Sequence, residues 1–252
     1  AICMQTKDFE RAFRAFVAGH AGATDGRYHY LALPEGRLAR RGTTAPLGAV
    51  VLLDRGPSGP AAIHRAPARL ALKLIAQQNV FGADDARPLL ADMHAIVRRL
   101  PCLVLSYADL DEAAALLEET FARWPIPRVP PMIADEAALT ARLMESEDSA
   151  PAVALDGYLP GMRLVRHPGV DLHVVDGEAF LAGSGETSAI HHLNTVGTGI
   201  WNLLAQPTSE DEAAEILAMA FPDVDRNVIA SDVATLFADL HASGFATEAH
   251  AE

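Results

Sequence analysis

The sequence predicts an α+β fold, with an N-terminal partial α/β region followed by a winged-helix-like module of three antiparallel strands and three helices. Up to residue 124, apolar runs typical of strands alternate with segments of helical periodicity. Six prolines then fall between positions 125 and 160. Beyond them, three short strand patterns precede three amphipathic helix patterns. We therefore expect three regions, at 1–124, 125–160 and 161–252.

The first region alternates helices and strands, with too few strands for a complete doubly wound sheet. We expect helices at 8–19, Ala68–Gln78, Pro88–Leu100 and Leu110–Trp124, the last capped by Asp109. We expect strands at Arg27–Leu33, Leu47–Leu53, Ala61–Arg65 and Cys102–Tyr107. Because Leu47–Leu53 is an almost continuous apolar run, we expect that strand to be buried on both faces. The proline-rich second region flanks one short helix, Asp135–Glu145, and is typical of a semi-rigid connector.

The third region carries clear signals for where its elements begin and end. We expect strands at Val170–Asp176, Ala179–Ala182 and Ser188–Leu193. Asn194 is placed to cap a first helix, Ser209 and Glu212 have the spacing of a capping box, and Asp225 is placed to cap the last helix. Gly244 is suited to the position after that helix. Trp201 is expected to anchor the small core, and we expect residues 160–252 to fold when expressed alone.

Charge and composition exclude several kinds of protein. The net charge is −13, and the part from residue 160 onward holds three basic and fourteen acidic residues, a net of −11. Such a module repels phosphate backbones, so we expect no nucleic-acid partner. No apolar run approaches the roughly 20 residues that span a bilayer, and the N-terminus lacks a signal-peptide layout. Cys3 and Cys102 form neither a disulfide framework nor a metal pattern. We therefore expect a cytoplasmic protein with no membrane partner.

A run of motifs in the third region resembles a known family. Leu193-Asn194, Ile200-Trp201, Thr208–Glu212, Asp232-Val233 and the final stretch Leu236–Phe245 follow one another in order. Over about residues 165–246 they resemble the coenzyme PQQ synthesis protein D family. That family is the recognition element for ribosomally made, post-translationally modified peptides. The resemblance implies a chaperone that holds the leader of a precursor peptide for a peptide-modifying enzyme in natural product biosynthesis.

A second, weaker resemblance covers residues 46–121. Pro46–Leu53, the following helices and Leu100–Leu105 resemble the C-terminal portion of domains related to HPr kinase/phosphorylase. A kinase needs a phosphate-binding loop with a lysine directly before serine or threonine, and neither Lys7 nor Lys73 stands in that position. The segment Gly56-Pro57-Ser58-Gly59 is expected to be a simple turn. We therefore expect no catalytic residues and no cofactor, which favours a binding protein over an enzyme.

An alternative stays open because the sequence begins at Ala1 without an initiator methionine. On this interpretation, the chain is a fragment of an HPr kinase-related ATP-dependent serine kinase fused to the recognition element.

The binding-protein hypothesis places the peptide on the third strand of the module. Ser188–Leu193 is expected to leave one edge unpaired, and the resemblance implies a leader peptide as a fourth strand between it and the last helix. Ala189, His191 and Leu193 share one face, and Ile190 and His192 share the other, but periodicity leaves open which face the groove. The candidate peptide-binding residues are Ser188, Ala189, Ile190, His191, His192, Leu193, Val233 and Phe237.

The histidines prompt a metal hypothesis that their spacing does not favour. His191 and His192 are adjacent on a strand, so their side chains point to opposite faces and one ion does not easily take both. We expect one of them inside the module, the other facing out, and no metal. His94, His167 and His241 are expected to be isolated surface or boundary residues.

Overall fold

The structure is a computed structural model with an α+β fold. It describes residues 2–5, 19, 22–24, 28–32, 40, 42–77, 85–123, 125–126, 129–130, 136–144, 158–185 and 189–249. The chain divides into two compact units, Ala1–Leu47 and Gly48–Glu252. Among the described residues, none of the helices has the length and apolarity needed to span a bilayer.

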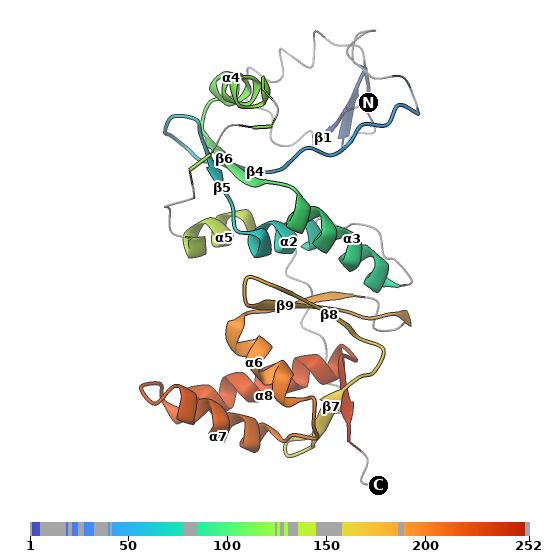
Figure 1. Cartoon of the computed structure of the whole chain (residues 1–252), viewed down its shortest axis with the longest axis vertical. Helices are drawn as coiled ribbons and strands as arrows, with labels where there is room; N and C mark the ends of the chain where they lie inside the picture. The colour runs from blue at the N-terminus through green and yellow to red at the C-terminus, as the bar shows by residue number, and fades with distance from the viewer. Residues whose placement is uncertain are drawn as a thin grey trace. The chain divides into compact units, whose positions relative to one another are not determined.

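The first unit contains a small antiparallel sheet (Figure 1). Its strands are β1 (Ile2–Gln5), β2 (Gly22–Thr24) and β3 (Tyr28–Leu31), with β3 in the middle. The strand expected at Arg27–Leu33 is therefore confirmed at its centre, while β1 and β2 were not predicted. The helix expected at 8–19 lies outside the described residues, apart from Gly19.

The second unit begins with a three-stranded sheet and four helices. In the sheet, β4 (Val50–Arg55) runs parallel to β6 (Cys102–Tyr107), and β5 (Ala62–Arg65) pairs antiparallel with β6 on its other side. The helices are α2 (Ala68–Gln77), α3 (Ala86–Arg99), α4 (Leu110–Phe121) and α5 (Glu136–Met144). All were predicted to within a few residues, and Asp109 caps α4 as expected by accepting hydrogen bonds from the backbone of Asp111 and Glu112.

The expectation that the strand near Leu47–Leu53 is buried on both faces is wrong. Leu52 and Asp54 are buried, but the side chain between them, Leu53, is 57% exposed. Helix α4 packs on β5 and β6, so in the described part of the chain it leaves the same face of β4 open. An edge strand with one covered face alternates between buried and exposed positions, whatever the hydropathy of its sequence.

The C-terminal part has the predicted order of three strands and three helices. Strands β8 (Asp171–Val175), β9 (Glu178–Ala182) and β10 (Ile190–Leu193) form an antiparallel sheet with β9 at the centre. The helices are α6 (Thr195–Leu203), α7 (Glu210–Ala220) and α8 (Arg226–Ala242). A two-stranded sheet of β7 (Leu164–Arg166) and β11 (Ala246–Glu248) was not predicted.

The predicted helix ends are confirmed. Asn194 accepts a hydrogen bond from the backbone N–H of Gly197, and Ser209 and Glu212 form a reciprocal capping box. Asp225 accepts from the backbone of Asn227 at the start of α8. Gly244 follows α8 with φ at 70°, a conformation that glycine adopts without strain.

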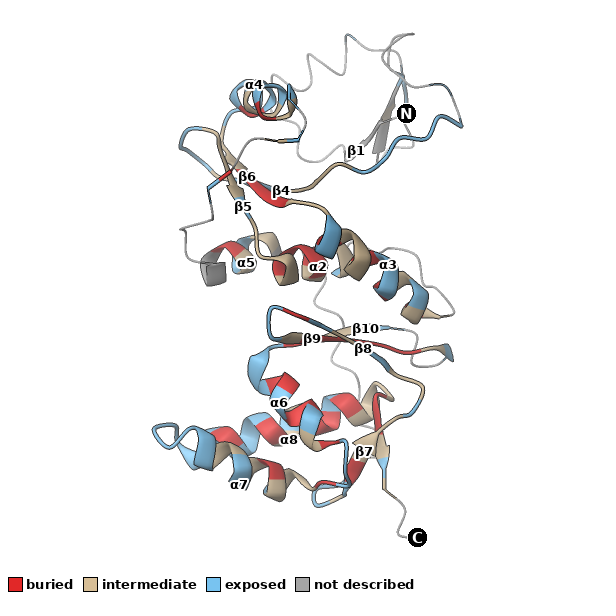
Figure 2. Ribbon diagram, viewed as in Figure 1, coloured by how far each residue is buried: buried red, intermediate tan, exposed pale blue. Residues whose placement is uncertain are grey.

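The two faces of the β8–β9–β10 sheet belong to two different hydrophobic cores. Ala179 and Leu181 pack with Trp201 in the core beneath α6, α7 and α8, and Trp201 is 1% exposed, as an anchor of that core should be. Phe180 and Ala182 point the opposite way and pack with α2 and α3. Figure 2 shows the resulting burial of β9 along most of its length.

Helix α2 lies between two sheets. Its buried residues Leu70, Ala71, Leu72 and Leu74 surround most of its circumference, and they share a core with Leu52 of β4 and Phe180 of β9. A helix that is apolar nearly all round is stable in water only when more than one face is covered. The second unit therefore stacks α4, a sheet, a layer of α2, α3 and α5, a second sheet, and a layer of α6, α7 and α8.

Candidate functional site

The outer edge of β10 is unpaired in the described part of the chain. The backbone N–H of Gly183 donates to the carbonyl of Ala189, which makes these opposed residues a hydrogen-bonded pair of the antiparallel ladder. Hydrogen-bonded and non-bonded pairs alternate, so His191 and Leu193 also direct their backbone groups toward β9. The N–H and C=O groups of Ile190 and His192 therefore point outward, and no strand among the described residues pairs with them.

The face of β10 that carries His191 and Leu193 looks toward α6 and α8. Leu193 is 3% exposed and belongs to the core around Trp201. The ring of His191 lies against Phe245, with 5.6 Å between centroids. Burial lowers the pKa of His191, and the carboxylate of Asp239 on α8 acts in the opposite direction. His191 thus sits where β10 and the C-terminal half of α8 come together.

The opposite face of β10 looks toward α2. Ile190 packs against the core that contains α2 and α3. The Nε2 atom of His192 lies 2.6 Å from an oxygen of Glu178, and its ring lies 4.9 Å from that of Phe180. Burial lowers the pKa of His192, the hydrogen bond to Glu178 opposes this, and the charge of Lys73 on α2 lowers it further.

The expectation that one histidine is interior and the other faces out is therefore wrong. Both His191 and His192 are partly buried, on opposite faces of β10 as the strand geometry requires. The face that the sequence pattern left to solvent is covered by α2. Contacts between segments about a hundred residues apart in the chain are not visible in the local pattern.

The remaining predicted site residues fall into three groups. Ala189 is exposed beside the open edge, whereas Ser188 lies outside the described residues. Val233 and Phe237 share one side of α8, but both are 0% exposed and belong to the core. They hold α8 against the core and do not reach the surface of the groove.

Sequence reasoning missed Asp239, Phe245 and Lys73, which act on or contact the β10 histidines. The helical spacing of α8 places Asp232 and Asp239 two turns apart on one side, and this signal was available in the sequence. For Lys73, no local signal was available, because its proximity to β10 depends on how α2 packs.

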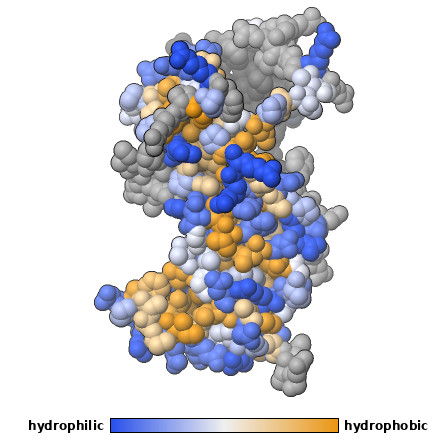
Figure 3. All heavy atoms as spheres, viewed as in Figure 1, coloured by the Kyte–Doolittle hydropathy of each residue, from blue (hydrophilic) through white to orange (hydrophobic). Residues whose placement is uncertain are grey.

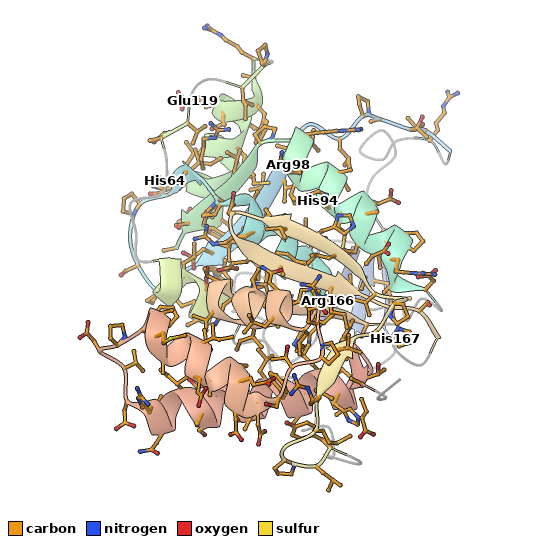
Figure 4. The ribbon with its side chains drawn as sticks, turned by 60° about the horizontal axis from the view of Figure 1, so that its bottom comes forward. His64, His94, Arg98, Glu119, Arg166 and His167 are labelled. Atoms are coloured by element: carbon orange, nitrogen blue, oxygen red, sulfur yellow. The ribbon has the colours of Figure 1, made fainter. Side chains whose placement is uncertain are left out.

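The expectation that His94 is isolated is also wrong. Figure 4 shows His94 on α3, above the sheet, and its Nδ1 atom lies 3.1 Å from Nδ1 of His173 on β8. Burial lowers the pKa of His94, and His173 and Arg98 lower it further. Within the ranges that the structure describes, no three histidine, cysteine or acidic side chains gather where they could hold a metal ion.

Comparison with known proteins bears on the C-terminal part of the chain. Residues 184–246 match the family model of coenzyme PQQ synthesis protein D (PqqD). The PqqD match includes β10, α6, α7, α8 and the first residue of β11, so the family resemblance inferred from the motifs is confirmed for this segment. It leaves out β8, β9 and the helices that cover them.

One solved structure and the curated proteins complete the comparison. The solved structure is described as TbiB1 in complex with the TbiA(beta) leader peptide, and it is 23% identical, with a TM-score of 0.30. The alignment covers 35% of this chain and 99% of TbiB1. No curated protein matches the chain.

Proposed function

We propose that this protein holds the leader segment of a ribosomally made precursor peptide, as a strand added to the open edge of β10. One observation carries the proposal: the N–H and C=O groups of Ile190 and His192 point outward beside α8 with no partner strand in the described ranges, within the segment that matches PqqD. An extended peptide completes such an edge with backbone hydrogen bonds. The PqqD-like motifs independently imply a peptide-holding role for the same segment.

In the proposed complex, affinity and specificity come from different groups. Backbone pairing with Ile190 and His192 places no demand on the peptide sequence. Side chains of the peptide that point to one face meet His191, Phe245 and the carboxylate of Asp239. Because Val233 and Phe237 are buried, we assign them the role of fixing the position of α8 rather than direct contact with the peptide.

A peptide-modifying enzyme is the second partner in the proposal. Apolar atoms gather at the α7–α8 end of the molecule in Figure 3. The side chains there include Ile216, Met219, Phe221, Val224 and Val228, which are 41–76% exposed. Contiguous exposed apolar surface of this kind commonly marks a protein interface. Asp223 and Asp225 lie among these residues, so the matching enzyme surface is expected to be apolar at its centre and basic at its rim.

The proposal treats the chain as a binding protein without catalytic groups of its own. Asp54 stands near the carboxyl end of the parallel strand β4, the end of a parallel sheet where ligands of α/β proteins usually bind. Its carboxylate instead accepts hydrogen bonds from Arg142 and from the hydroxyl of Ser106. The resemblance to HPr kinase-related domains, and with it the kinase-fragment alternative, stays a prediction.

The test is a titration of the full chain with synthetic leader peptides of candidate precursors, followed by amide chemical shifts. We expect the largest shifts in β10 and in the C-terminal half of α8. Ile190→Pro removes an outward donor and should weaken binding about fivefold, since a backbone hydrogen bond contributes on the order of 1 kcal/mol.

Val174→Pro is the matched control. Val174 is opposite Ala179 in a non-bonded pair, so its N–H points to the open edge of β8. The substitution makes the same lesion on the other side of the sheet and should leave leader binding unchanged. If Val174→Pro abolishes binding and Ile190→Pro does not, the peptide binds at β8 and the proposed site is wrong.

A further inference from the structure

The polar side chains of α2 form a single stripe along an otherwise apolar helix. Arg69, Lys73 and Gln77 follow one another at intervals of four residues, which places them on the same side of the helix. The remaining residues between Ala68 and Ala76 are apolar, and most are buried. The stripe is therefore the side of α2 that lies at the rim of the core, where the helix meets solvent.

Ion pairs fix the first residue of this stripe against the sheet. The guanidinium of Arg69 lies 3.5 Å from Glu178 and 4.0 Å from Asp176, and the backbone N–H of Arg69 donates to the same aspartate at 3.2 Å. Glu178 in turn contacts His192 of β10 at 2.6 Å. The start of α2 is thus anchored at the end of the sheet where β9 begins.

Helix and strand spacing then place Lys73 along the same line. Four helical residues rise about 6 Å, and two strand residues advance about 6.6 Å. One step from Arg69 to Lys73 therefore matches the step from Glu178 to the cross-strand pair of Phe180 and His192. The charge of Lys73 lowers the pKa of His192, which agrees with this placement.

The ammonium group of Lys73 is available to bind an acidic ligand. It is partly exposed and makes no ion pair with any residue that the structure describes. It is also one of only two lysines in a chain of net charge −13. Its neighbour on the stripe, Arg69, is already engaged by two carboxylates.

We propose that α2 forms the second wall of the peptide groove on β10, and that Lys73 binds a carboxylate side chain of the incoming peptide. The inference rests on the proposed function and extends it to the chemistry of the ligand. In an added strand, alternate side chains point to opposite faces of the sheet. An Asp or Glu therefore occupies a position facing α2, while the neighbouring positions face His191 and Asp239.

The test uses a display library of random peptides selected on the full chain. Only peptides whose binding is lost with Ile190→Pro are retained, which restricts the set to ligands of the β10 edge. We expect Asp or Glu to be enriched at one position of these peptides. With Lys73→Gln, affinity for a selected acidic peptide should fall about fivefold, the effect of a partly exposed ion pair near 1 kcal/mol.

Charge reversal gives the decisive comparison. Lys73→Glu should shift the selected preference at that position from acidic to basic side chains. Arg226→Glu is the matched control, because it makes the same change in net charge at the exposed first turn of α8. It should leave the preference unchanged.

The outcomes separate the two proposals. Peptides that bind at β10 with no acidic preference, or with a preference that Lys73→Glu does not alter, overturn the role of Lys73 and leave the proposed function standing. If no peptide depends on the β10 edge, the proposed function fails and the role of Lys73 fails with it.

Discussion

Single residues in this protein take their roles from segments far away in the chain. Asp54 is 6% exposed, and its partners Ser106 and Arg142 come from β6 and α5. The hydrogen bond from Arg142 lowers the pKa of Asp54, burial opposes this, and Ser106 lowers it further. A buried carboxylate at this position is stable only because both partners are supplied. The sequence predicted β4 but gave no indication of this ion pair.

Asp54→Asn should destabilise the protein by about 1–3 kcal/mol at pH 7, since charge-assisted hydrogen bonds to a half-exposed arginine are lost. The pKa of Asp54 is lower in the folded than in the unfolded chain, so its contribution is fully present above about pH 4 and is lost as the pH falls. The difference between the variant and the parent should therefore shrink below pH 4. Urea denaturation at several pH values measures it.

Asp92→Asn is the control for this experiment, because Asp92 is exposed on α3 and the substitution makes the same change in charge. A destabilisation of the Asp54 variant that is the same at pH 3 and pH 7 would contradict the role assigned to the ionised carboxylate.

At the scale of helices and strands, local signals were reliable where the two interacting groups lie close together in the sequence. The caps at Asp109, Asn194, Ser209 and Asp225 all lie within three residues of the groups they bind, and each was predicted. β7 and β11 were missed because each is three residues long and is stabilised by a partner about eighty residues away.

The sequence of helix α2 has apolar residues on two sides, and this pattern indicates more than the single packed face that was predicted. Leu70 and Leu74 define one apolar stripe, but Leu72 points nearly the opposite way. A helix with both sides apolar predicts burial between two layers. Reading that pattern would have indicated that something beyond the first sheet covers α2, though not that the cover is β9.

In the candidate site, too, the features set by local geometry were predicted and those set by distant packing were not. The open edge of β10 and the alternation of its side chains were predicted from strand geometry, and His191 and His192 do point to opposite faces. The burial of Val233 and Phe237 was not decided by periodicity, because the helical face toward a groove and the face toward the core are adjacent on α8.

The exposed patch on α7 and α8 yields a prediction about the proposed enzyme partner. Met219→Lys combined with Val228→Lys should abolish association with the proposed modifying enzyme, because it places two cations against a surface expected to be apolar at its centre and basic at its rim. Both positions are more than half exposed, so stability should change by no more than about 0.5 kcal/mol. Titration calorimetry with the enzyme measures the effect.

The control variant places two lysines on β8 instead of on the patch. Leu172→Lys with Val174→Lys alters two exposed apolar residues on β8 and should leave enzyme association intact. Leader binding should be unaffected in both double variants. Loss of enzyme association in both would show that charge alone is responsible and that the patch is not the interface.

At the scale of the whole second unit, the PqqD-like segment shares its sheet with the preceding region. Val175 and Phe180 are at most 1% exposed and pack under α2 and α3. When residues 160–252 are expressed alone, as in the prediction that they fold by themselves, this apolar surface has no cover. Burial of a large apolar side chain contributes about 1.5–3 kcal/mol, so removing the cover should cost the isolated segment several kcal/mol. The division of the chain at residues 124 and 160 stays a prediction.

We expect a fragment of residues 158–252 to melt at a lower temperature than a fragment of residues 48–252, and to bind a hydrophobic dye. Val175→Thr with Phe180→Thr should have opposite effects in the two: it should improve the solubility of the short fragment and destabilise the long one. Calorimetry and light scattering distinguish these results. Equal melting temperatures for the two fragments would contradict the shared core.

The position of α2 between two sheets also has a consequence during synthesis. One side of the helix packs on β4 and β6, the second of which ends at Tyr107, but the other side is covered only by β9, which ends at Ala182. About a hundred residues separate the end of α2 from the end of β9, and at 5–20 residues per second a ribosome takes roughly 5–20 s to make them. Throughout that interval, the nascent chain presents an apolar helix surface whose final cover does not yet exist. A ribosome-associated chaperone, or the same strands from a neighbouring nascent chain, has that time to bind it first.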